Sequence, residues 1–200
     1  MKQMKRWMLA LAMGLCTCLI LSLCGFGEAC EDISERVLRL HVLAASDSEE
    51  DQTLKLKVRD AIIAETDGLL DGVESTALAK KQLETVLPQI KQIAETCLRD
   101  NGCEDTVAVS LCETYFTTRQ YDSVTLPAGY YDALRVVIGE GKGKNWWCVV
   151  FPPMCLSGAC EDDLDTVLTK EQCDIVTQPK RFSVRFKLVE WMYDIKSWFS

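Results

Sequence analysis

The segment that most constrains the fold is residues 139–155, which read GEGKGKNWWCVVFPPMC. Trp146 and Trp147 are adjacent, and neighbouring side chains of an extended strand point to opposite faces of a sheet. One ring can therefore enter the core while the other faces outward or toward a partner. Pro152 and Pro153 remove two backbone N–H donors, so a central strand cannot continue past them.

Two cysteines bracket these prolines. Cys148 and Cys155 are close enough in sequence for a turn to bring their sulfurs together, and we predict that they form a disulfide. The chain has 11 cysteines, of which three lie in an apolar N-terminal run. The other eight are an even number, which favours disulfides in an exported chain but leaves the remaining pairing open. Because there is no Cys-x-x-Cys motif and only one histidine, no metal site or cofactor is predicted.

The N-terminus has the pattern of an export signal. Three basic residues precede an almost uncharged run at residues 7–27. Small residues near Ala29 fit signal-peptidase cleavage, and the run also reaches the about 20 apolar residues that span a bilayer. Residues 1–29 are therefore predicted to be either a cleaved signal peptide or an uncleaved anchor that contacts the membrane. Residues 30–200 are predicted to form one exported domain.

Charge narrows the choice of partners. The net charge of -8 argues against nucleic acid, because binding to phosphates requires a basic surface. No motif indicates a small-molecule substrate. A phosphate-binding loop at residues 139–145 is excluded, because the required Ser or Thr is missing and the segment joins two predicted strands.

Residue patterns predict an α+β fold that begins with a strand and two helices. Residues 36–45 alternate between apolar and other side chains, which indicates a strand with one buried face. Ser46 and Glu49 have the spacing of a capping box and predict the start of the first helix. Ser75 is predicted to cap a second helix, which carries a narrow apolar stripe.

The second half of the chain is predicted to add three strands and a helix. Residues 106–116 and 130–138 and the strand with the two tryptophans form a three-stranded antiparallel segment, the last two joined as a hairpin. Residues 157–180 are predicted to be a loop excursion. An aromatic helix from residue 185 either packs on the core or docks on a membrane or partner.

The candidate contact residues are Arg39, His41, Trp146 and Trp147. Arg39 and His41 lie on the strand face opposite the apolar set, where residues are usually solvated. Since Trp and Arg are enriched at interface hot spots, they are predicted to form a partner-binding patch with the tryptophans. The alternative is a hydrolase in which His41 activates Cys148, a pair that needs an adjacent imidazole and thiolate. No catalytic residue is assigned.

Several blocks resemble the stage II sporulation protein R family. They are RLHVLAASDS at 39–48, QTLKLKVRD at 52–60, LPAGYYDALRVVIG at 126–139, NWWCVVFPPMC at 145–155 and LVEW at 188–191. The block with the two tryptophans is very specific. The chain departs from the family pattern at Ala45, where the family usually has Asn, and at Thr117, where it usually has Pro.

The resemblance implies an exported signalling protein of endospore formation that is not an enzyme. In that family the forespore secretes the protein across its membrane into the space between the two septal membranes. There it activates a membrane-embedded aspartic-type protease of the mother cell, which removes the pro-sequence of the sigma-E factor. The protease's extracytoplasmic part is thus the implied partner. The alternative is an exported septal cell-wall or thiol hydrolase.

Overall fold

The computed structural model describes residues 2–121, 124–152, 164 and 166–198. It confirms the α+β class, with a long N-terminal helix, a mixed sheet and C-terminal helices. The helices are α1 (Lys2–Glu35), α2 (Glu49–Leu70), α3 (Thr76–Asp100), α5 (Lys170–Thr177) and α6 (Pro179–Trp198). The strands are β1 (Leu38–Leu43), β2 (Val107–Phe116), β3 (Arg119–Tyr121), β4 (Val124–Leu126), β5 (Gly129–Ile138) and β6 (Asn145–Phe151).

Strand β1 lies at the centre of the sheet, whose order is β2-β5-β1-β6. It pairs parallel to β5 and antiparallel to β6. The predicted antiparallel pairing of β2 with β5 is confirmed, but the predicted hairpin of β5 with β6 is wrong. The reason is that β1 is buried on both faces, which favours a central place between the two strands.

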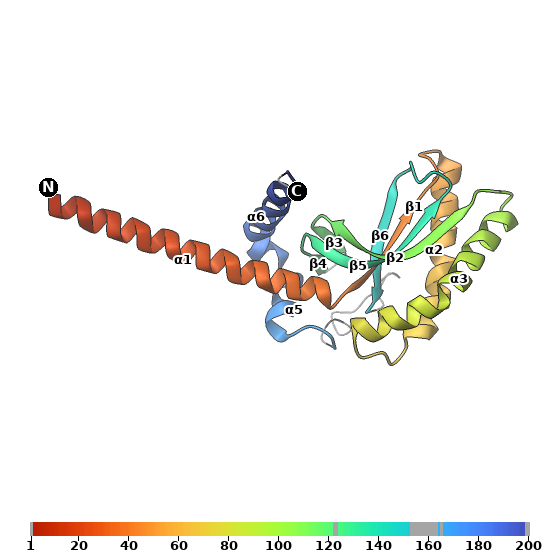
Figure 1. Cartoon of the computed structure of the whole chain (residues 1–200), viewed down its shortest axis with the longest axis horizontal. Helices are drawn as coiled ribbons and strands as arrows, with labels where there is room; N and C mark the ends of the chain where they lie inside the picture. The colour runs from red at the N-terminus through yellow and green to blue at the C-terminus, as the bar shows by residue number, and fades with distance from the viewer. Residues whose placement is uncertain (1, 122–123, 153–163, 165, 199–200) are drawn as a thin grey trace.

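Helices lie on both sides of the sheet (Figure 1). The buried apolar side chains form two clusters, one on each side. Helices α2 and α3 cover one face of the sheet, over Leu40, Val42 and Leu134. The end of α1, the β3–β4 ribbon, α5 and α6 cover part of the other face, over Phe116, Tyr131 and other residues. The core therefore lies in two layers, and the second layer brings the last part of α1 together with the C-terminal helices α5 and α6.

Helix α2 begins two residues later than predicted. Its N-cap is Ser48 rather than Ser46, because the Ser48 hydroxyl accepts a hydrogen bond from the Asp51 N–H (3.1 Å). Ser46 instead accepts from the Ser48 N–H (3.1 Å) and donates to the Asp51 carboxylate. The predicted N-cap of α3, Ser75, is confirmed, and α3 continues through Pro88 to Asp100.

We expect Ser48→Ala to lower the free energy of unfolding by about 1 kcal/mol, because the Asp51 N–H loses its acceptor. Ser46→Ala should cost less, since it leaves that helix donor satisfied. Urea unfolding of both variants followed by circular dichroism measures the difference. A larger loss for Ser46→Ala would show that the cap is at the residue predicted from sequence.

A close junction joins the loop after β5 to the turn after β1. The Gly143 N–H donates to the Ala44 carbonyl (2.9 Å), and the Lys144 N–H donates to the Asp47 carboxylate (2.7 Å). Lys55 of α2 is buried, and its ammonium group donates to the Lys144 carbonyl (3.0 Å). These bonds carry the chain across the end of β1 and fix where β6 starts.

The predicted loop excursion at 157–180 contains helix α5, so that prediction is wrong for its second half. Thr169 and Gln172 form a capping box, in which each side-chain oxygen accepts a hydrogen bond from the backbone N–H of the other residue. Val176 is completely buried in the second apolar cluster and gives the helix its packing.

Helix α1 runs without a break through Ala29, the residue after which cleavage is predicted. Its last part is built into the domain, since Phe26, Cys30 and Ile33 are buried. Its first part is exposed and is long and apolar enough to cross a membrane. A secretory signal has the same length and composition, so α1 fits either role.

Candidate functional site

Part of the sheet face opposite α2 and α3 is open. Strand register places its side chains in two cross-strand rows, one of Ser110, Arg135, His41 and Trp147 and one of Ala108, Val137, Leu43 and Asn145. We call these residues the open sheet face. All except His41 are exposed or half-buried in the described part of the chain. A surface formed by rigid strands is suited to contact with another protein.

Arg39 lies one row deeper and is 0% exposed, so the prediction that it is a surface residue is wrong. Its Cζ lies 3.9 Å from the centroid of the Phe116 ring and 4.8 Å from that of Tyr131. Its Nη2 donates to the Tyr121 hydroxyl, which ties β3 to β1. Nε and Nη1 have no hydrogen-bond acceptor among the described residues. Burial lowers the pKa of Arg39, and the two tyrosines oppose this effect.

His41 is 8% exposed and reaches the open sheet face only by its edge. Its Nε2 lies 3.0 Å from the Asn145 amide oxygen, which only accepts, so the ring donates from Nε2. Burial lowers the pKa of His41, the bond to Asn145 opposes this, and the charges of Arg135 and Arg39 add to the lowering. The ring is therefore neutral at pH 7.

We expect the stability of the protein to fall in acid partly through His41. Because its pKa is lowered from 6.5 in the folded state, the unfolded chain binds more protons below that pH. The contribution of His41 to the free energy of unfolding is fully present above about pH 6.5. Below that pH it is lost at up to about 1.4 kcal/mol per pH unit, until the pH reaches the pKa of His41 in the folded state.

His41→Gln removes this contribution, and it changes the only histidine of the chain. Urea midpoints measured from pH 7.5 to 5 should fall more steeply for the wild type than for His41→Gln. Parallel curves would show that the ring is not buried in its neutral form.

The two tryptophans point to opposite faces, which confirms that prediction. Trp147 lies on the open sheet face, where the Arg119 Cζ is 3.9 Å from its ring centroid. Trp146 packs on the helix-covered face, where the Arg59 Cζ of α2 is 4.2 Å from its ring centroid. The structure therefore does not bring Trp146 together with the other candidate contact residues.

The hydrolase with Cys148 and His41 is incompatible with this fold. Cys148 is opposite Leu40 in the pairing of β1 with β6 and belongs to the helix-covered core, whereas His41 points to the other face. Cys148 is also disulfide-bonded, so no thiolate is present. Cys155 lies outside the described residues, and the Cys148–Cys155 pairing stays a prediction.

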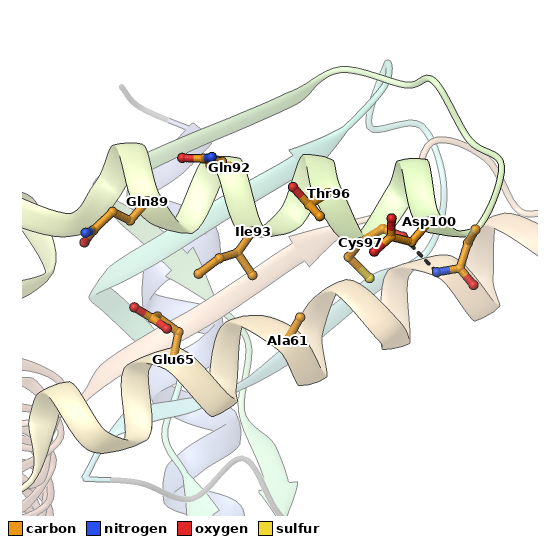
Figure 2. Close-up of a pocket in the computed structure, with 9 residues that line it drawn as sticks. Ala61, Glu65, Gln89, Gln92, Ile93, Thr96, Cys97 and Asp100 are labelled. Carbon is orange, nitrogen blue, oxygen red and sulfur yellow. Dashed lines mark hydrogen bonds between the residues drawn. The ribbon is translucent and has the colours of Figure 1, made fainter.

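A groove of about 540 Å³ lies between α2 and α3 (Figure 2). Ile93 and Cys97 point from α3 toward Ala61 on α2, and polar side chains line the opening. Burial raises the pKa of the Cys97 thiol, which disfavours the reactive thiolate. In the part of the chain that the structure describes, no cluster of His, Cys, Asp and Glu could hold a metal ion. Among the described residues that line it, the groove therefore offers no candidate metal site, and its thiol is not activated.

Sequence patterns missed three residues of the site. Arg119, Arg135 and Asn145 come from different segments and meet only through strand pairing. The alternation in the 130–138 strand could have placed Arg135 on the face opposite Leu134. No local signal could have placed Arg119 on the Trp147 ring.

Comparisons with known proteins agree on one family. A family model described as Stage II sporulation protein R (spore_II_R) matches residues 34–161, which include β1 through β6. The chain is 32% identical over 187 residues to Stage II sporulation protein R of Bacillus subtilis (strain 168). That match covers 82% of this chain and 84% of the relative. No solved structure matches the chain. The chain therefore belongs to the stage II sporulation protein R family.

Proposed function

We propose that this chain is an exported sporulation signalling protein that activates a membrane-embedded aspartic-type protease. The activated protease removes the pro-sequence of the sigma-E factor in the mother cell. The observation that carries the proposal is family membership, with 32% identity across most of both chains. The chain itself converts no substrate and acts by binding the extracytoplasmic part of the protease.

The open sheet face is the surface that we assign to this contact. Trp147 and Arg119 form a stacked pair there, and Trp and Arg are the residue types most enriched at interface hot spots. Arg119 and Asn145 are exposed around the half-buried Trp147 ring. Arg39 supports this surface from below, because it holds the β3–β4 ribbon through Tyr121.

The apolar first part of α1 supports export. Residues that are exposed along α1 include Trp7, Leu11 and Leu15, which suits a lipid environment better than water. We propose that the forespore secretes the protein across its membrane, so that the domain after α1 faces the intermembrane space. There it can reach the protease in the opposite membrane.

Co-expression in a non-sporulating bacterial host tests the proposal. The host carries the membrane protease and pro-sigma-E from the same organism as this chain, and immunoblots measure conversion of pro-sigma-E. We expect conversion when the full chain is present and little without it. A chain that begins at Cys30 lacks the apolar first part of α1 and keeps its last six residues. It is the matched control, which should stay in the cytoplasm and give no conversion. Equal conversion with and without the full chain would overturn the proposal.

A further inference from the structure

Helix α6 has two apolar faces on opposite sides. At about 100° per residue, spacings of four, three and four residues put one set on a common face. This set packs into the second apolar cluster and consists of Phe182, Phe186, Val189 and Tyr193. Spacings of seven, four and three residues put another set about half a turn away. This set, which we call the outer face of α6, consists of Val184, Trp191, Ile195 and Trp198.

The outer face is strongly exposed, with 71% of Val184, 61% of Trp191 and 86% of Trp198 accessible to solvent. Large apolar side chains that are exposed at regular helical spacing indicate a surface that binds another protein or a membrane. The basic residues Lys180 and Lys187 lie on the same side of the helix and are exposed, and Lys187 also forms an ion pair with Glu190 (3.0 Å). The positive charges of these two lysines contrast with the net charge of the whole chain, which is -8.

The position of α6 indicates what covers this face. Helix α6 crosses α1 near the end of the uncharged run, where the Phe26 ring centroid is 5.7 Å from that of Phe182 and 5.6 Å from that of Phe186 (Figure 1). The Arg185 guanidinium also donates to the Ser22 hydroxyl (3.3 Å). The first acidic residue of α1, Glu28, follows directly. The two helices therefore meet at the level where α1 would leave a bilayer.

The chemistry of the outer face fits that level of a membrane. Tryptophan is enriched at the boundary between acyl chains and headgroups, because its ring is apolar and its N–H is polar. Lysines beside an apolar helix face are attracted to anionic headgroups. Trp191 and Trp198 together with Lys180 and Lys187 supply both features on one side of α6.

We propose that the outer face of α6 is a lipid-binding surface that lies in the headgroup region of an anionic bilayer, with α1 retained as the membrane-spanning anchor. The two helices then hold the domain at a fixed height and orientation on the membrane. The inference concerns where the protein sits and is independent of protease activation.

Tryptophan quenching by brominated lipids tests this with the full chain reconstituted in vesicles. Trp7→Phe is introduced first, because Trp7 lies in the span, and four of the five tryptophans then remain. We expect lipids brominated near the headgroup to quench the emission. Changing Trp191 and Trp198 to Phe should reduce the quenched emission by about twofold or more, since these rings lie at the boundary. Changing Trp146 and Trp147 to Phe should leave it unchanged.

The lipid composition and a second variant separate the possible results. Quenching should be stronger in vesicles of mixed phosphatidylcholine and phosphatidylglycerol than in phosphatidylcholine alone, and Lys180→Gln with Lys187→Gln should remove the difference. Ile195→Glu keeps all tryptophans and should weaken quenching in the anionic vesicles. Quenched emission that does not depend on Trp191 and Trp198 in either lipid would overturn the inference and indicate that another protein covers this face.

Discussion

Gly143→Ala is expected to lower the free energy of unfolding by about 3 kcal/mol, because the added methyl group has no room. An ideal Cβ at Gly143 would lie 2.1 Å from the Ser46 carbonyl oxygen and 2.5 Å from its carbon, and both are backbone atoms. A flexible side chain could move aside, but here two chain segments must separate. The bonds of Gly143 to Ala44 and of Lys144 to Asp47 would then lengthen together.

Gly68→Ala is the matched control. Nothing lies within 4 Å of its Cβ position, and Gly68 is near the end of α2. There alanine should raise the free energy of unfolding by about 0.5–1 kcal/mol, since glycine is a poor helix former. Urea unfolding of both variants gives the two values. Similar effects of the two substitutions would contradict the close junction between β1 and β6.

Trp147→Leu is expected to reduce activation of the protease by about 30-fold, the equivalent of about 2 kcal/mol at a hot spot. Leucine keeps an apolar side chain beside Phe116 but removes the ring on which Arg119 stacks. The co-expression assay, run with graded amounts of the chain, measures the amount needed for half-maximal conversion of pro-sigma-E.

Trp146→Leu is the control for this experiment, because both rings are half-buried and each has an arginine over it. It should weaken packing on the helix-covered face but leave activation intact in the fraction of protein that folds. Ser110→Arg adds a large group to the open sheet face at an exposed position and should also reduce activation. If Trp147→Leu and Ser110→Arg activate normally, the contact lies on another surface.

The elements of this fold were largely predictable because their signals are local. Alternation placed β1, and the Ser75 cap placed the start of α3. Helix α5 was missed although Thr169 and Gln172 have capping-box spacing, which is a readable signal. The order of strands was not predictable, since the pairing of β6 with β1 depends on contacts between distant segments.

In the candidate site, too, the features with a local signal were predictable and those that depend on distant contacts were not. The opposite orientations of Trp146 and Trp147 follow from strand geometry alone. The burial of Arg39 does not, because the rings that enclose it belong to Phe116, Tyr121 and Tyr131. In sequence an arginine among apolar residues resembles a solvated edge position, and only the packed β3–β4 ribbon makes it internal.

The central place of β1 has a consequence for when the domain can fold. β1 follows α1 directly, yet both strands that flank it are synthesised much later, after α2, α3 and β2. Pairing between distant segments is slow to form, because the intervening chain must first close a long loop. The domain thus cannot close in the producing cell before most of the chain has been made. In the export that we propose, this delay would favour translocation, because the sheet could not close before most of the chain had been made.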